Sequence, residues 1–254
     1  MSIKGIIFDV NGTLIDIHTN EWHDDVYRVI SNVLSYQGVK LNPDVVKDLF
    51  FRIIKEQKLA GGERQPEFDV VEVFRQIVAQ HASDVTRALP QEKRAQLPQF
   101  LAEVHRAGSR VRLQLYPGVQ GTIQQLHSRY ALAIISDAQT VYAVPELNTL
   151  DLAAYFDPII ISGDFGYRKP DVRLFEAALS RMALAPSEVL FVGNDLYRDV
   201  HGAQKLGIKT VFFKSGESVQ DKGHAVPDYI IYSFPELLNA VRFFEDSDRR
   251  QAGR

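Results

Sequence analysis

Residues 6–14 read Ile6-Ile7-Phe8-Asp9-Val10-Asn11-Gly12-Thr13-Leu14. A short apolar run that ends in a glycine turn predicts a buried strand. Asp9 stands at the carboxyl end of this strand, which is where open α/β sheets bind their ligands. The segment therefore predicts the first strand of a parallel sheet with a functional carboxylate at its end.

The composition is that of an ordinary globular protein. The chain has 254 residues, 45% of them hydrophobic, enough for one large α/β domain or for a core with a smaller insert. Because 29 Lys and Arg face 32 Asp and Glu, the formal charge is -3, and we expect no nucleic-acid partner. No apolar run approaches the roughly 18 residues of a membrane span, so we expect no membrane partner.

Cysteine is absent, which excludes disulfides, thiol catalysis and thiolate metal sites. This absence is compatible with a reducing cytoplasm. The first residues run directly into the predicted strand and leave no room for a signal peptide. We therefore expect a cytoplasmic protein that acts on a small molecule, as a monomer or a homodimer.

The pattern of apolar residues divides the chain into two parts. Within residues 16–112 every signal is helical, with apolar stripes such as the one that contains Val26 and Ile30. Outside this segment, short apolar runs alternate with helical patterns, which predicts a parallel sheet covered on both faces. We expect an α/β fold, with a Rossmann-like parallel sheet from residues 1–15 and 113–254 and an inserted α-helical domain.

Polar clusters follow four of the predicted strands. Any one of them alone is most often a turn or a helix cap. Four clusters in order, each after a strand, are better explained by a site, because the carboxyl ends of parallel strands lie at one edge of the sheet. The candidate members are Asp9, Asn11, Thr13, Ser136, Asp137, Lys169, Asn194, Asp195 and Asp199.

These clusters resemble the four motifs of the haloacid dehalogenase superfamily. The stretches that carry the resemblance are Asp9-Val10-Asn11-Gly12-Thr13-Leu14, Ile134-Ile135-Ser136-Asp137, Arg168-Lys169-Pro170-Asp171 and Gly193-Asn194-Asp195-Leu196-Tyr197-Arg198-Asp199. The resemblance covers nearly the whole chain, and the helical insert is similar to the helical cap domain of that superfamily. It implies a hydrolase that forms a covalent intermediate on Asp9.

The residue types suit the roles that the resemblance implies. Asp9 would attack the substrate as a carboxylate, and this divides one displacement into two easier ones. Lys169 would keep Asp9 ionised and offset charge on the transferring group. Thr13, Ser136 and Asp137 would bind the phosphate together with nearby backbone N–H groups. Mg²⁺ is the implied cofactor, since it prefers oxygen ligands. Its implied ligands are Asp9, the backbone carbonyl of Asn11, and Asn194, Asp195 or Asp199.

Two positions depart from the pattern of the superfamily's phosphatases. Asn11 replaces the Asp that acts as general acid and base, and such catalysis is worth about 10² to 10⁴ in rate. Asn194 replaces a metal-binding Asp, and its amide oxygen binds Mg²⁺ without contributing charge. Asp195 is either a substitute ligand or the N-cap of the next helix. Asp199 either reaches the metal through water or orients Lys169.

Three functions compete. The favoured one is a Mg²⁺-dependent phosphatase of a small phosphate ester with reduced or specialised activity. The second is a metal-independent 2-haloacid dehalogenase-like hydrolase, but no Arg closely follows the first motif and the fourth motif lacks Ser-Asn-x-x-Asp. The third is a weakly catalytic protein that binds phosphate ligands. The two Asn substitutions motivate this third function, and the retention of Asp9 and Lys169 argues against it.

Substrate choice is expected to lie in the helical insert. Each candidate there has a structural alternative, since aromatic residues often belong to a core and charged residues to a solvated surface or a cap. The candidates are His18, Trp22, His23, Tyr27 and Arg64.

Overall fold

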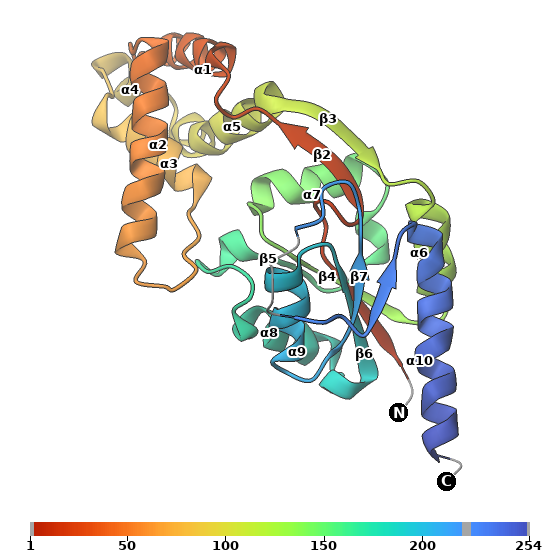
Figure 1. The fold of residues 1–254 in the computed structure, drawn as a ribbon. Coiled ribbons are helices and arrows are strands. Elements are labelled where there is room, and N and C mark those ends of the chain that lie inside the picture. Colours follow the sequence, from red (N-terminus) through yellow and green to blue (C-terminus); the bar gives the residue numbers. More distant parts are fainter. Residues whose placement is uncertain (1–2, 220–224, 253–254) are drawn as a thin grey trace.

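The computed structural model describes residues 3–219 and 225–252, which contain a six-stranded central sheet (Figure 1). The strands lie in the order β5-β4-β1-β6-β7-β8, and all neighbouring pairs are parallel. β1 (Gly5–Phe8), the run that precedes Asp9, lies in the interior of the sheet. The others are β4 (Ala131–Ser136), β5 (Ile159–Ile161), β6 (Val189–Gly193), β7 (Lys209–Phe213) and β8 (Tyr229–Ile231). The prediction of a parallel sheet is confirmed.

Helices cover both faces of this sheet because successive strand side chains point to opposite sides. In β1, Ile6 and Phe8 enter the core on one face, and Ile7 enters the core on the other. The first face is covered by α6 (Val119–His127), α7 (Thr140–Thr149) and α10 (Leu237–Ala252), and the second by α8 (Val172–Met182) and α9 (Gly202–Gln204). Short 3-10 helices occupy Ala153–Tyr155, Ser162–Asp164, Pro186–Glu188 and Phe234–Glu236, and a π-helix occupies Leu196–His201. The Rossmann-like arrangement is confirmed.

The insert forms a helical body with its own core (Figure 1). Tyr27, Phe50 and Phe74 are fully buried there and surround the ring of His105. Burial of these rings stabilises the packing of the insert helices. These helices are α1 (Asp24–Tyr36), α2 (Pro43–Ala60), α3 (Val70–Gln80), α4 (Asp84–Ala88) and α5 (Gln91–Ser109). Among the described residues, no helix combines the length and the apolar character that crossing a membrane requires.

Two strands connect the insert to the sheet. β2 (Ile15–Thr19) and β3 (Arg110–Leu115) form an antiparallel ribbon that leads from the sheet to the helices (Figure 1). The expectation that residues 16–112 are helical throughout is wrong at these two ends. Apolar and polar residues alternate along both segments, a period of two that is typical of half-buried strands. Asp16 also accepts hydrogen bonds across the ribbon from Arg112.

Candidate active site

Asp9 and Asp199 meet at the ammonium group of Lys169. Lys169 Nζ donates hydrogen bonds to Asp9 Oδ1 at 2.6 Å, to Asp199 Oδ1 at 2.7 Å and to the backbone carbonyl of Ile135 at 3.1 Å. All three charged side chains are buried. The structure therefore places one buried cation between two buried carboxylates at the carboxyl edge of the sheet.

The protonation of these groups follows from their mutual interactions. Burial alone lowers the pKa of Lys169, but the carboxylates of Asp199 and Asp9 outweigh it and raise this pKa above its usual value. Burial raises the pKa of Asp199 to about 7, against the opposing effect of the Lys169 ammonium. Lys169 is therefore charged at neutral pH and offsets the charge of the Asp9 carboxylate.

The backbone of the fourth motif wraps around Asp199. Asp199 Oδ2 accepts hydrogen bonds from the backbone N–H groups of Asn194 and Asp195 at 3.1 and 3.0 Å. A Cβ atom on Gly193 would overlap the same carboxylate, so only glycine fits at that position. Because Oδ2 is held by the backbone, Oδ1 faces Lys169 and Asp199 orients the ammonium group.

Asp195 caps the helix that follows it. Its Oδ1 atom accepts hydrogen bonds from the backbone N–H groups of Tyr197 and Arg198 at 2.9 and 2.8 Å. Its Oδ2 atom accepts a hydrogen bond from Arg198 Nε at 2.7 Å. Both oxygens are thus engaged at the start of the π-helix, as the helix-cap alternative expects. A metal-binding role for Asp195 stays a prediction.

Thr13 and Asn194 connect the first motif to the fourth. Thr13 Oγ1 lies 3.0 Å from Asp9 Oδ2 and 3.3 Å from Asn194 Oδ1. Asn194 Nδ2 donates to the backbone carbonyl of Glu217 at 3.2 Å, so the amide oxygen is the end turned toward Asp9. Gly12, with φ at +83°, passes so close to this amide that a Cβ atom there would overlap it.

Two polar side chains follow β4. Ser136 Oγ is buried and has no hydrogen-bond partner among the described residues. Asp137 Oδ1 accepts a hydrogen bond from the backbone N–H of Lys169 at 2.9 Å, and its Oδ2 is unpartnered within the same set of residues. A buried polar group without a partner costs free energy. Both atoms therefore keep unused hydrogen-bonding capacity.

A pocket of about 270 Å³ opens beside these residues. It is lined both by residues of the motif loops and by residues of the helical insert. The polar lining side chains include Asn11, Asp137 and Arg168 from the core, and Glu21, Glu67 and Arg106 from the insert. Asn11 therefore faces a space that core and insert share.

The insert is closed onto the core around this pocket. The side-chain amide of Gln139 donates to the backbone carbonyl of Phe68 at 2.6 Å and accepts from the backbone N–H of Val70 at 2.9 Å. The hydroxyl of Ser162 donates to Glu67 Oε2 at 2.7 Å. The segment between α2 and α3 is thus bonded to the loops that follow the strands.

The five insert residues expected to select the substrate do not line this pocket. Trp22 is 65% exposed and stacks on Phe51 with ring centroids 3.9 Å apart. Tyr27 is buried in the core of the insert, and His23 caps α1. The other two are His18, on β2, and Arg64, in the segment between α2 and α3.

Sequence reasoning missed four charged residues that line the pocket, Glu21, Glu67, Arg106 and Arg168. The sequence does hint that Arg168 belongs to the site, because this residue directly precedes Lys169. Glu67 lies in the segment that separates two helical patterns, and Arg106 lies within a helical pattern. Nothing in their spacing relates either of them to the motifs.

Oxygen donors for a metal ion gather on one side of Asp9. The described residues contain no group of three or more His, Asp or Glu side chains that could hold a metal ion. Asp9 Oδ2 and Asn194 Oδ1 both approach the Thr13 hydroxyl, so one carboxylate and one amide oxygen lie close together. An all-oxygen donor set suits Mg²⁺ rather than a soft metal. The residues fit Mg²⁺, in a site of low charge.

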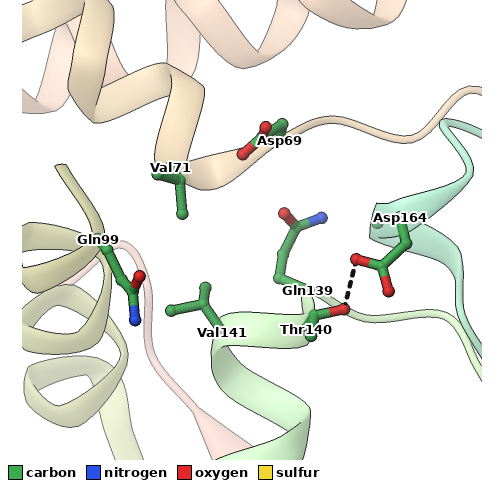
Figure 2. Close-up of a pocket in the computed structure, with 8 residues that line it drawn as sticks. Asp69, Val71, Gln99, Gln139, Thr140, Val141 and Asp164 are labelled. Atoms are coloured by element: carbon green, nitrogen blue, oxygen red, sulfur yellow. Dashed lines mark hydrogen bonds between the residues drawn. The ribbon is translucent and has the colours of Figure 1, made fainter. Parts of the chain in front are cut away.

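A second pocket, of about 310 Å³, lies between the insert and the core (Figure 2). It is lined by Asp69, Gln99, Thr140 and Asp164 among others, and Thr140 Oγ1 donates to Asp164 Oδ1 at 2.6 Å. Although this pocket is larger, its lining contains no residue of the four motifs. The chemistry is therefore assigned to the pocket beside Asn11.

Comparison with known proteins places these features in a family. A family model described as haloacid dehalogenase-like hydrolase matches residues 6–213. The glyceraldehyde 3-phosphate phosphatase of Pyrococcus furiosus is 27% identical over 97% of this chain and 96% of its own length. The phosphoglycolate phosphatase of Yersinia pseudotuberculosis is 27% identical over 94% of each chain.

Solved structures share the fold. The 2-haloacid dehalogenase from Pseudomonas syringae pv. Tomato DC3000 superposes with a TM-score of 0.69, covering 95% of this chain and 99% of that chain. Its sequence is 21% identical, so the likeness concerns the fold alone.

Proposed function

Because the chain belongs to the haloacid dehalogenase-like hydrolase family, we propose that this hydrolase cleaves small phosphate monoesters through a phosphoryl-aspartate formed on Asp9. The observation that carries the proposal is the buried Lys169 ammonium bound to Asp9 near an unpartnered Ser136 hydroxyl. A fixed cation and a free donor suit a transferring phosphoryl group, which carries negative charge on its outer oxygens. Relatives named as phosphatases over nearly their full length support the same activity.

In the first step, a carboxylate oxygen of Asp9 bonds to phosphorus and the bond from phosphorus to the ester oxygen breaks. The electron pair leaves with the ester oxygen, which takes a proton from water. Lys169 holds the Asp9 side chain by a hydrogen bond before the attack and offsets charge on the phosphoryl group. Ser136 donates a hydrogen bond to a phosphoryl oxygen.

In the second step, water attacks the phosphorus of the acyl phosphate, inorganic phosphate departs and the Asp9 carboxylate is restored. Asn11 lines the pocket where this water would stand. Its amide can orient the water or the leaving oxygen, but it neither gives nor takes the proton. Both steps then rely on water for proton transfer, at a cost of about 10² to 10⁴ in rate.

Mg²⁺ would be held by Asp9, the backbone carbonyl of Asn11 and the amide oxygen of Asn194. When bound, the ion would offset charge on the phosphoryl oxygens. The carbonyl of position 11 is unaffected by the substitution there. Because Asp9 is the one carboxylate of this set, we expect weaker Mg²⁺ affinity than a site with two or more carboxylates would have.

The insert, residues 16–112, is proposed to act as a cap over the core of residues 1–15 and 113–254. The bonds of Gln139 to Phe68 and Val70 support this role, because they hold the insert against the loops that carry the motifs. Water would then reach the phosphoryl group through the shared pocket rather than from open solvent.

The test is phosphate release from p-nitrophenyl phosphate, glyceraldehyde 3-phosphate and phosphoglycolate, measured with Mg²⁺ and with EDTA. We expect turnover that requires Mg²⁺ and that Asp9→Asn abolishes. The nitrophenolate group leaves without protonation, so this ester is the substrate least affected by Asn11.

Two outcomes would replace the proposal. Halide release from 2-haloacids in the presence of EDTA would identify a metal-independent dehalogenase. Binding of phosphate esters without turnover, under the conditions that support turnover in other phosphatases, would identify a binding protein.

A further inference from the structure

Unsatisfied polar atoms are concentrated beside the proposed phosphate site. Four buried side-chain nitrogen or oxygen atoms lack a hydrogen-bond partner among the described residues, and three of them are Ser136 Oγ, Asp137 Oδ2 and Arg168 Nε. The fourth belongs to Gln37, in the insert. Since folded proteins leave few such atoms, three at one edge of the sheet mark a place prepared for a polar ligand. Ser136 donates to the phosphate in the proposed reaction, whereas Asp137 Oδ2 and Arg168 Nε take no part in its steps.

Asp137 is held in one orientation. Its side chain is 3% exposed, and the backbone N–H of Lys169 fixes its Oδ1 atom at 2.9 Å. Oδ2 therefore cannot turn away from the pocket without breaking that bond. Its nearest cations are Arg198 Nη1 at 3.6 Å and Arg168 Nε at 3.9 Å, both beyond hydrogen-bond distance.

Arg168 Nε is a donor and Asp137 Oδ2 an acceptor, and the two buried atoms lie 3.9 Å apart without a direct hydrogen bond. Arg168 Nε also lies 3.3 Å from Glu67 Oε2, but without the geometry of a hydrogen bond. A separation of 3.9 Å is too long for a direct bond, and an oxygen placed to one side of the line between the two atoms can reach both. A hydroxyl group satisfies both atoms at once, because it accepts from the guanidinium and donates to the carboxylate.

The charges around the pocket disfavour an acidic substituent at this position. Glu21, Glu67 and Asp137 all line the pocket. Arg106 is already engaged, since its Nε and Nη2 atoms donate to the two oxygens of Glu146 at 2.7 and 3.2 Å. A substrate carboxylate would therefore meet three carboxylates with Arg168 as its main cation.

We infer that Asp137 and Arg168 form a subsite for a substrate hydroxyl group next to the phosphate ester. The substrate class is then a small phosphate monoester of a neutral, hydroxylated carbon chain. Because Asp137 directly follows Ser136, this hydroxyl lies within a few bonds of the ester oxygen. The inference rests on the proposed phosphatase function and specifies the substrate of the same site.

The kinetic test compares glycerol 1-phosphate with propyl phosphate, which lacks the hydroxyls. We expect kcat/KM to favour glycerol 1-phosphate by about tenfold or more, the effect of one or two hydrogen bonds in a site with otherwise unpaired groups. In Asp137→Asn and in Arg168→Gln this ratio should fall toward one. Arg181→Gln, at an exposed arginine on α8, is the matched control and should keep the ratio. A ratio that both site variants leave unchanged would overturn the assignment.

A binding test separates the subsite from the chemistry. Asp9→Asn is titrated calorimetrically with glycerol 1-phosphate, propyl phosphate and phosphoglycolate. Tighter binding of glycerol 1-phosphate than of the other two esters supports the subsite. This conclusion would hold even if the parent protein turned over no ester. Absence of turnover would contradict only the proposed phosphatase function. Equal affinities, a preference for phosphoglycolate, or no binding of any ester would each overturn the subsite.

Discussion

At the scale of single residues, Lys169 determines both the charge and the stability of the candidate site. Its ammonium is the shared partner of Asp9 and Asp199. Removing one partner of a buried ionic group costs about 3–5 kcal/mol, because the remaining charges lose their compensation. A Lys169 variant would therefore confound folding with chemistry. Asn11 is partly exposed, so its substitution reports on chemistry alone.

We expect Asn11→Asp to raise kcat. A carboxylic acid at this position can protonate the leaving oxygen and then accept a proton from the attacking water, so the gain should be about tenfold or more. It should be larger for an alkyl phosphate than for p-nitrophenyl phosphate, whose leaving group needs no proton. Asn148→Asp, at an exposed position on α7, is the control. An unchanged or lower kcat would contradict the role given to position 11.

We expect Gly12→Ala to lower both the melting temperature and the activity. Gly12 has φ at +83°, where a side chain is strained, and its Cβ would overlap the Asn194 amide. Gly62→Ala is a matched control, because Gly62 has φ at +64° and nothing within 4 Å of the added Cβ. The control should lose about 1 kcal/mol of stability from backbone strain and keep its activity. Thermal melts that shift equally in the two variants would show that the Asn194 contact is unimportant.

The residues at the strand ends could be found from the sequence, whereas those contributed by the insert could not. Asp9, Lys169 and Asp199 each follow a strand, and parallel strands bring their ends to one edge, so their meeting at hydrogen-bond distance follows from the pattern. Glu67 and Arg106 reach the pocket through the closure of the insert, which no local pattern encodes. Trp22, which was expected to line the pocket, does not line it, because no local pattern shows how the insert packs on the core.

At the scale of elements, α5 presents a buried histidine to α7. His105 Nδ1 lies 3.2 Å from the hydroxyl of Tyr142, and Nε2 lies 3.5 Å from the hydroxyl of Tyr27. Burial, helped to a smaller extent by the neighbouring Arg106, lowers the pKa of His105 to about 3. In the folded protein, His105 therefore stays neutral in the pH range in which an exposed histidine becomes protonated.

We expect His105 to weaken the fold as the pH falls. The unfolded histidine has a pKa near 6.5 and the folded one a pKa of about 3. Between these values only the unfolded state binds the proton, so the free energy of unfolding falls by up to about 1.4 kcal/mol per pH unit. Above pH 6.5 this contribution is constant.

Urea unfolding of His105→Gln at a series of pH values checks this sign. The slope of stability against pH between about 6.5 and 4 should be shallower than in the parent protein. His127→Gln, at an exposed histidine, should keep the parent slope. If both variants keep it, His105 is not the titrating group.

Helices with a regular repeat of apolar residues could be predicted from the sequence, whereas the two short strands of alternating apolar and polar residues could not. The four longer helices of the insert, α1, α2, α3 and α5, repeat their apolar residues over successive turns, a signal that tolerates exceptions such as the exposed Phe100. β2 has five residues and β3 six, too few for the alternation to outweigh the helical pattern beside them. Antiparallel pairing of segments nearly a hundred residues apart, as for Asp16 with Gln114, is also invisible to local periodicity.

At the scale of the whole molecule, a buried ion pair couples the insert to the sheet domain. Arg106 on α5 binds Glu146 on α7 through two hydrogen bonds, and both side chains are largely buried. Such a pair contributes little net stability compared with an apolar pair. Removing one partner, however, leaves the other charge buried without compensation.

We expect Glu146→Gln to destabilise the protein by about 3 kcal/mol and the double variant Arg106→Met/Glu146→Leu to recover most of that loss. Urea titrations followed by fluorescence and by circular dichroism measure this difference. Losses that simply add in the double variant would mean that the two side chains act independently.

The position of β1 inside the sheet determines how late in synthesis this strand can pair with its neighbours. Gly5 pairs with Ala131 on one side and with Val189 on the other, so β1 is synthesised well before the two strands that flank it. The insert completes its helices at Ser109 and can fold while β1 is still unpaired. A nascent chain therefore carries the apolar segment Ile6-Ile7-Phe8 unpaired for most of its synthesis, and such segments are prone to aggregation. Chains longer than 112 residues plus the length of the exit tunnel should already resist protease in the insert, while protection of β1 should require chains longer than 193 residues plus the same tunnel length.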